Sequence, residues 1–422
     1  MKTTLFSFLL FAVLFIGCSD DGDSPNVPKK RVNIELTNEE RLVNEQVRDF
    51  SFDFIHAFAQ KKENGQPELK NYAISPLSLS WALGMVLNGA NGETYRQIQE
   101  VLGLAEMDNN NINQYMQTMR TALADVDNTA VFLEANSIWM KKGMNFLPDF
   151  KQTNKTYYDA LLKSDVDFDQ KTADAINKWC NEKTKGMIPK FVESSEIDDL
   201  KVLLLNALYF KGKWAKPFEP SETRMQNFVC KDGTLLRTPM MAKKGENLHC
   251  VSTDDVIIVS LPYGNQAFNM QLLLPADPTV PVEDLLKNLT LEQWNEWEAQ
   301  KKTYSVTLTL PKFDIDYEDK EIHNVMKALG MTDAFTEKAD FSNMSDVSLL
   351  IAWIKQRSVI HVDESGTEAA AVTGVGMLES SAEGLAFPTL QVDFNRPFAF
   401  FITEVSTNTV LFAGKVGEPV VK

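Results

Sequence analysis

Catalytic signatures are missing from this sequence of 422 residues. It contains no Gly-x-Ser-x-Gly elbow, no His-Glu-x-x-His pair, no glycine-rich phosphate loop and no Cys-x-x-Cys pair. Only four histidines occur, and they are scattered without a second ligand type at metal spacing: His56, His249, His323 and His361. The sequence therefore predicts no metal site and no cofactor, and it offers no sign of an enzyme.

Cysteine is scarce as well. Cys18 lies close to the N-terminus, which leaves Cys180, Cys230 and Cys250 in the rest of the chain. An odd number of cysteines without metal-like spacing excludes a disulfide framework. We expect these three side chains to be small buried residues.

An excess of basic residues is also absent. The chain has 42 Lys and Arg against 58 Asp and Glu, so its net charge is −16 and its pI is about 4.8. Nucleic-acid partners require clustered positive charge, and this composition argues against them. The balance fits a soluble, exported protein.

The N-terminal apolar run is too short to span a membrane. Lys2 precedes an apolar stretch from Leu5 to Ile16, which suits the core of a signal peptide rather than a transmembrane helix. Phe15-Ile-Gly-Cys18 resembles a bacterial lipobox, although Phe15 departs from the usual Leu. Residues 1–18 are therefore predicted to be a lipoprotein signal peptide with lipidated Cys18, the alternative being an ordinary signal peptide cleaved elsewhere.

A polar, turn-rich stretch, Ser19-Asp-Asp-Gly-Asp-Ser-Pro25, follows Cys18 and predicts a flexible acidic tether over residues 19–36. Acidic residues directly after the lipidated Cys resemble the surface-export signal of Bacteroidetes lipoproteins, the alternative being a plain solvated linker. We expect the protein to be exported and anchored by lipid to a bacterial outer membrane. Exposure at the cell surface or toward the periplasm stays open.

The remaining chain, residues 37–422, shows no linker and no internal repeat, which predicts one large domain. Helical signals gather early: a capping box at Thr37-Asn-Glu-Glu40 before apolar residues at helical spacing, a helix from Pro76 to Asn88, and one from Asn91 to near Gly103.

Strand signals gather later. They predict a strand buried on both faces from Val202 to Phe210 and a half-buried strand from Tyr304 to Leu310. Two hairpins are expected, at Val256 to Leu274 and at Phe398 to Val416. Helices and strands that are interspersed rather than alternating indicate the α+β class.

One segment near the C-terminus is unusual. Glu364-Ser-Gly-Thr-Glu-Ala-Ala-Ala371 consists mostly of small side chains and follows a β-branched strand, Ser358 to Val362. If Thr367 began a strand, then Thr367, Ala369 and Ala371 would share one face, small enough to enter a packed sheet. From these residues alone, an Ala- and Gly-rich flexible linker is an equally good interpretation.

Four motifs resemble those of the serpin family of serine protease inhibitors. Glu364 to Ala371 resembles the serpin hinge, and Phe394-Asn-Arg-Pro-Phe398 resembles the segment after the reactive loop. Asn71-Tyr-Ala-Ile-Ser-Pro-Leu-Ser-Leu79 resembles the shutter signature, and Leu205-Asn-Ala-Leu-Tyr-Phe-Lys-Gly-Lys-Trp214 the strand-and-breach signature. The resemblance extends from about Val43 to Glu418.

The resemblance implies a serpin fold: a central mixed sheet, further smaller sheets, about eight or nine helices and an exposed reactive loop at about 364–393. It implies a suicide substrate, which a protease cleaves and which then traps the acyl-enzyme by inserting its hinge into the central sheet. The implied hinge residues are Glu364, Gly366, Thr367, Glu368, Ala369, Ala370 and Ala371. The implied shutter and breach residues are Ser75, Ser78, Asn206, Trp214 and Gln356.

One implied shutter residue departs from the family pattern, because Gln356 occupies a position where relatives often carry His. Gln can form hydrogen bonds but does not titrate near neutral pH. Trp214 has a second interpretation as a simple core residue, and both roles can hold.

The resemblance implies a scissile bond between Ser380 and Ser381. Glu379 and Leu378 are close alternatives, because the loop is longer than in compact relatives. Small residues suit an elastase-like protease, Leu378 a chymotrypsin-like or cysteine protease, and Glu379 a Glu-specific protease. No Lys or Arg lies between Glu364 and Arg396, which disfavours trypsin-like targets. We expect a monomer, and the alternative function is a binding or surface protein whose loop is cut without trapping.

Overall fold

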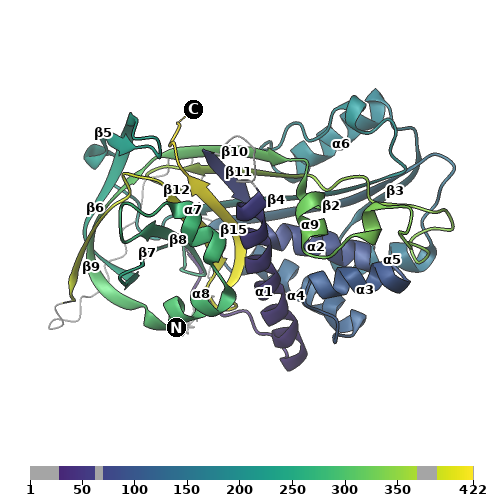
Figure 1. Cartoon of the computed structure of the whole chain (residues 1–422), viewed down its shortest axis with the longest axis horizontal. Helices are drawn as coiled ribbons and strands as arrows, with labels where there is room; N and C mark the ends of the chain where they lie inside the picture. The colour runs from purple at the N-terminus through teal and green to yellow at the C-terminus, as the bar shows by residue number, and fades with distance from the viewer. Residues whose placement is uncertain (1–27, 62–69, 368–386, 422) are drawn as a thin grey trace, which may run out of the picture.

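The computed structural model describes residues 28–61, 70–367 and 387–421 (Figure 1). The expected hinge residues Glu368 to Ala371, the reactive-bond candidates Leu378 to Ser381, and Cys18 lie outside these residues. The described helices are α1 Asn38–Lys61, α2 Pro76–Leu87, α3 Gly92–Val101, α4 Asn109–Asp125, α5 Pro148–Tyr158, α6 Gln170–Lys183, α7 Val282–Asn288, α8 Leu291–Gln300 and α9 Ile322–Ala328, with short 3-10 turns at Ser194–Glu196, Pro220–Glu222 and Asp333–Phe335.

The described strands form two sheets. They are β1 Asn71–Ile74, β2 Ala130–Lys141, β3 Leu161–Val166, β4 Val202–Lys213, β5 Arg224–Val229, β6 Leu235–Ser252, β7 Val256–Pro262, β8 Phe268–Pro275, β9 Lys302–Pro311, β10 Phe313–Asp319, β11 Gln356–Val362, β12 Gly366–Thr367, β13 Thr389–Asp393, β14 Phe398–Glu404 and β15 Thr409–Val416. The predicted α+β class is confirmed.

The six-stranded sheet has the order β10-β11-β12-β4-β2-β3. It is mixed, because β2 and β3 run parallel while the other neighbours are antiparallel. The further sheets expected beside it merge into one nine-stranded sheet, since the 18-residue strand β6 pairs with β5, β7 and β9 along its length.

The central strand β4 is buried on both faces, as its apolar run predicts. Leu203, Leu205 and Ala207 pack in a core with α6, whereas Leu208 and Phe210 belong to the main core. Figure 1 shows α6 on one side of β2, β3 and β4, and α2, α3 and α5 on the other. This alternation follows from the two-residue repeat of strands.

Most element boundaries match the sequence expectations within a few residues. The capping box at the start of α1 is present: the Thr37 amide donates to Glu40 Oε2 at 2.8 Å, and the Glu40 amide donates to Thr37 Oγ1 at 3.2 Å. Both predicted hairpins are antiparallel pairs, β7 with β8 and β14 with β15. The three described cysteines are free and buried.

The range predicted as a tether contacts the body of the protein in its later part. The Lys29 amide donates to Asn128 Oδ1 at 2.8 Å, the Ile34 amide donates to Ser406 Oγ at 2.9 Å, and Leu36 is buried. The flexible tether was predicted over residues 19–36, and within that range Lys29, Ile34 and Leu36 contact the domain.

Candidate functional site

The start of the expected hinge is already a strand of the six-stranded sheet. In β12, Thr367 lies opposite Val362 of β11 on one side and opposite Gly212 of β4 on the other. The range 364–393 had been expected to be loop, but its described ends are strands, β12 and β13. The chain leaves β11, turns within Asp363 to Ser365 and enters the sheet beside its own preceding strand.

Asp363 shapes this turn. Its Oδ1 accepts hydrogen bonds from the amides of Ser365 at 2.7 Å and Gly366 at 3.2 Å, and its own amide donates to the Gly366 carbonyl at 3.0 Å. Gly366 has a φ of +153°, and a Cβ there would meet the Gly212 carbonyl oxygen at 2.1 Å. Only glycine fits where the backbone passes so close to β4.

The Thr367 side chain is fully buried beneath the turn. Its hydroxyl lies 2.5 Å from the Tyr263 hydroxyl, and the Tyr263 ring stacks on Trp214 with 4.5 Å between ring centroids. Burial raises the pKa of Tyr263 far above its ordinary value, so the phenol stays neutral and can donate this bond.

Trp214 holds the other side of the turn. Its indole N–H donates to the Asp363 carbonyl at 3.0 Å, and its amide donates to the Ser365 carbonyl at 2.9 Å. Trp214 also packs against Phe218 in the main core. Both interpretations of Trp214 from the sequence, breach contact and core packing, agree with this position.

Glu364 ties the turn to two other segments. Its Oε1 accepts a hydrogen bond from Thr223 Oγ1 at 2.7 Å, and its Oε2 forms an ion pair with Lys312. Burial alone would raise the pKa of Glu364, but the Lys312 ammonium and the Thr223 hydroxyl outweigh it and lower the pKa. The carboxylate is therefore charged at neutral pH.

The expected shutter residues meet at the N-terminus of α2. Gln356 Oε1 accepts from the Ser75 amide at 2.9 Å, and Gln356 Nε2 donates to the Ser75 carbonyl at 2.8 Å. Ser75 Oγ accepts from the Ser78 amide at 3.1 Å and donates to the Leu411 carbonyl at 2.6 Å. Gln356 thus joins β11 to α2 by two neutral hydrogen bonds.

Asn206, on β4, does not hydrogen-bond to this cluster. Its Nδ2 donates to Asn136 Oδ1 on β2 at 2.5 Å, while its Oδ1 is buried without a hydrogen-bond partner. Ser358 Oγ on β11 is also buried and unpartnered. Within the described residues no ladder joins β11 directly to β4, and β12 is the sole strand between them.

Several residues of this site lie outside the motifs identified in the sequence. Tyr263 was predicted only as part of a hairpin, and Asp363, Thr223 and Lys312 were assigned to no site. Lys312 lies between β9 and β10, and no local sequence pattern indicates its contact with Glu364, which is 52 positions later in the chain.

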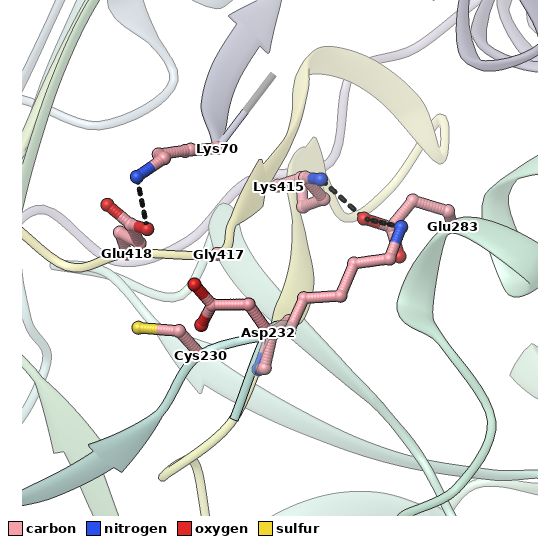
Figure 2. Close-up of a pocket in the computed structure, with 9 residues that line it drawn as sticks. Lys70, Cys230, Asp232, Glu283, Lys415, Gly417 and Glu418 are labelled. Atoms are coloured by element: carbon pink, nitrogen blue, oxygen red, sulfur yellow. Dashed lines mark hydrogen bonds and ion pairs between the residues drawn. The ribbon is translucent and has the colours of Figure 1, made fainter. Parts of the chain in front are cut away.

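Elsewhere the described residues offer little for catalysis. No group of three or more His, Cys, Asp and Glu side chains in them could hold a metal ion, and none of the described helices has the length and apolarity to cross a membrane. A small surface pocket is bordered by Lys70, Cys230, Asp232, Lys415 and Glu418 (Figure 2).

The charges of this pocket are already engaged with one another. Lys70 lies 2.5 Å from Glu418, and Lys415 lies 2.5 Å from Glu283 (Figure 2). Burial, and then the nearby Glu418 and Asp232 carboxylates, raise the pKa of the Cys230 thiol. A thiol with a raised pKa is a poor nucleophile.

Comparisons with known proteins agree with the geometry of the sheet. Residues 45–419 match the family model described as serpin (serine protease inhibitor). Neuroserpin from Gallus gallus is 32% identical over 365 residues, covering 83% of this chain and 87% of its own length. Leukocyte elastase inhibitor from Xenopus tropicalis is 32% identical over 383 residues, covering 88% and 97%.

Among solved structures, the thermophilic serpin tengpin in its native state superimposes with a TM-score of 0.79 and 31% identity, covering 92% of this chain and 100% of that one. The family match spans most of the chain, the relatives align over nearly their full length, and the fold is shared. This chain therefore belongs to the serpin family of protease inhibitors.

Proposed function

We propose that this protein inhibits a protease as a suicide substrate rather than acting as an enzyme. The target's serine hydroxyl, or a cysteine thiol, attacks the carbonyl carbon of the scissile peptide bond. The C–N bond breaks, the new amino terminus takes the proton, and an acyl-enzyme ester or thioester remains. Insertion of the freed hinge into the six-stranded sheet then carries the protease away before water hydrolyses that bond.

The observation that carries this proposal is the position of Thr367. Its side chain is buried in the sheet, and β12 already pairs on both sides with β11 and β4. An extended strand can therefore continue from Thr367 along the same line. Glu364, Gly366, Thr367, Glu368, Ala369, Ala370 and Ala371 are the hinge in this proposal.

The sheet beyond β12 supports the same mechanism. Asn206 Oδ1 and Ser358 Oγ are buried without partners on the two strands that flank the path of insertion. Each such atom costs free energy until it finds a donor or acceptor. An inserted strand would supply backbone donors and acceptors to both strands, so cleavage releases free energy that the intact fold holds back.

We place the reactive bond at Ser380–Ser381, with Glu379 and Leu378 as alternative positions before the bond. Small residues here suit an elastase-like target, and the relative named leukocyte elastase inhibitor is consistent with that class. Chymotrypsin-like, Glu-specific and cysteine proteases are the other candidates. The lack of Lys and Arg between Glu364 and Arg396 disfavours trypsin-like proteases.

The decisive experiment is formation of a covalent complex. The protein is mixed with elastase-, chymotrypsin-, trypsin-like, Glu-specific and cysteine proteases, and SDS-resistant complexes are sought. Mass spectrometry of the released C-terminal peptide then identifies the cut bond. A complex with an elastase-like enzyme and none with a trypsin-like enzyme is expected. Cleavage by every protease without any complex would support the alternative, a surface or binding protein of serpin fold.

We further propose that the protein is an exported bacterial lipoprotein that acts as a monomer. Residues 1–18 are the signal peptide, Cys18 carries the lipid, and the serpin domain comprises residues 37–422. The test is Cys18→Ala, which should move the protein from the membrane fraction to the soluble fraction while inhibition is retained, because lipid only anchors. An unchanged membrane fraction would contradict the lipobox.

A further inference from the structure

His361 connects the turn before β12 to the edge strand β10. Its Nδ1 contacts Asp314 Oδ1, the carboxylate of its cross-strand partner. Its Nε2 lies 3.8 Å from Asp363 Oδ2. The other carboxylate oxygen of Asp363, Oδ1, accepts hydrogen bonds from the amides of Ser365 and Gly366, which form the turn. One imidazole ring therefore lies between two carboxylates, and one of these carboxylates shapes the hinge.

This arrangement selects the charged form of the ring. A neutral imidazole has one N–H and one lone pair, so one of its nitrogens would direct a lone pair at a carboxylate. The imidazolium ion has two N–H donors and attracts both anions. The geometry alone therefore predicts that His361 is protonated when β12 is in place.

Among the described residues, Asp314 and Asp363 are the charged groups that contact the ring. Asp314 approaches from β10 and Asp363 from the turn. On the same face of β11, Arg357 is bound by Asp316, with two contacts of 2.9 Å. From β4, Lys211 and Lys213 flank Gly212 and share that face, two strands away from His361, so their charges act from a greater distance.

We propose that protonated His361 is a positioning residue for the hinge: it holds Asp363, and through Asp363 the turn that places Thr367 in the sheet. Loss of the proton then loosens the turn. The titratable group is at the root of the hinge and not in the shutter, where Gln356 is uncharged at any ordinary pH.

The pH range over which His361 positions the hinge follows from its raised pKa. The Asp363 carboxylate first, and the Asp314 carboxylate second, raise the pKa of His361 to about 9 against the opposing effect of partial burial. An unperturbed histidine has a pKa of about 6.5. A raised folded-state pKa means that the contribution is complete below about pH 6.5 and is lost as the pH rises through about 9.

Trp214 gives a direct readout, because its indole N–H donates to the Asp363 carbonyl. We would label the tryptophans with 5-fluorotryptophan, assign Trp214 with a Trp214→Phe variant, and record ¹⁹F NMR spectra from pH 6 to 10.5. The Tyr263 ring that stacks on Trp214 does not interfere, because burial raises its pKa far above this range.

In the wild type the Trp214 resonance should titrate with a midpoint near pH 9. In His361→Gln it should be flat at the shift of the wild type above pH 10. In Asp314→Asn, which keeps the ring but removes one carboxylate, the midpoint should fall. A Trp214 resonance that does not titrate in the wild type, or titrates equally in His361→Gln, would overturn the proposal. The Asp314→Asn result decides the matter if His361→Gln fails to fold.

The consequence for inhibition rests on the proposed function. The fraction of cleaved inhibitor that ends in covalent complex should fall in the wild type between pH 7 and pH 10, whereas His361→Gln should give a low fraction at both values. If the resonance titrates but no complex forms at any pH, the proposed function fails and the positioning role of His361 stands. If complexes form equally well in both proteins at pH 7, the link from hinge position to inhibition is contradicted.

Discussion

The hydroxyls of Thr367 and Tyr263 lie 2.5 Å apart, although 104 residues separate them in the chain. Thr367 is the second residue of β12, and Tyr263 belongs to the turn between β7 and β8 in the nine-stranded sheet. The contact therefore links the hinge to the second sheet, inside a site that also holds the Trp214 ring.

Tyr263→Phe, Thr367→Val and the double variant should reveal this contact as a coupling. Tyr263→Phe leaves the Thr367 hydroxyl without its partner, and Thr367→Val leaves the Tyr263 hydroxyl without its partner. The double variant removes both hydroxyls. We expect a coupling free energy of about 0.5–1.5 kcal/mol in urea unfolding. Strictly additive effects would show that the two hydroxyls do not interact.

Thr367→Arg should convert the protein from inhibitor to substrate. The Thr367 side chain is fully buried, and a guanidinium there would be a buried charge without a partner. Hydrolysis should then outpace insertion, so the yield of covalent complex on SDS gels collapses while loop cleavage continues. Thr367→Ser is the matched control and should keep most of the yield. An equal yield in Thr367→Arg would argue against insertion at this position.

Lys312→Met should destabilise the protein at neutral pH by about 1–3 kcal/mol, because Glu364 would keep a partly buried charge without its ammonium partner. The pKa of Glu364 is lowered in the folded wild type, so its contribution is present above its unfolded pKa of about 4.3 and is lost as the pH falls through the folded value. The stability difference between wild type and Lys312→Met should therefore shrink below about pH 4.

Urea unfolding at pH 3.5, 5 and 7 measures this difference. Lys302→Met is the control, because Lys302 is an exposed lysine at the start of β9, the strand that ends directly before Lys312. A gap that is independent of pH would assign the loss to packing of the Lys312 stem instead of to its charge.

Gln356→His should introduce a pH dependence that the wild-type shutter lacks. A histidine side chain at this buried position cannot reproduce both hydrogen bonds to Ser75, which costs about 1 kcal/mol. Burial disfavours the charged ring, so stability should fall further as the pH drops below about 6.5, where the unfolded chain takes up a proton. Melting curves at pH 5.5, 6.5 and 8 test this. Parallel pH profiles for variant and wild type would refute it.

Cleavage in the loop should raise the thermal stability of the protein. A cut between Leu378 and Ala382 by a protease that is not trapped allows the chain after Thr367 to continue β12 between β11 and β4, with a new ladder of backbone hydrogen bonds. The melting temperature of the nicked form should exceed that of the intact form by tens of degrees, the scale expected when many kcal/mol are added to a domain. Protein incubated with inactivated protease is the control, and an equal or lower midpoint after cleavage would falsify the metastable fold.

Local patterns predicted part of the fold. The capping box at Thr37 and Glu40 and the helical spacing after it predicted α1, and the unbroken apolar run from Val202 predicted a strand buried on both faces. The small residues around Gly366 and Thr367 predicted a segment able to enter a sheet. These features depend on neighbours in the sequence, which is why they can be read from it.

The contacts that hold the hinge depend on tertiary packing instead. Nothing near Lys312 or Thr223 indicates that both bind Glu364, and nothing near Asp314 indicates that it faces His361. His361 falls inside the predicted strand Ser358 to Val362, and nothing in the sequence marks it further, because Asp314 becomes its neighbour only after β10 and β11 pair. The early entry of Thr367 into the sheet also has no local signal, since it depends on the space between β11 and β4.

The attachment of Lys29 to Asn128 determines from which end of the molecule the upstream chain departs. Asn128 lies just before β2, whose first residue, Ala130, is opposite Gly212, and Gly212 is opposite Thr367. An anchor on Cys18, as proposed, would therefore hold the hinge end of the molecule toward the membrane that carries it. The length of the tether would then limit the size of the protease that can reach the reactive loop. Proteases that act close to that membrane would reach the loop first.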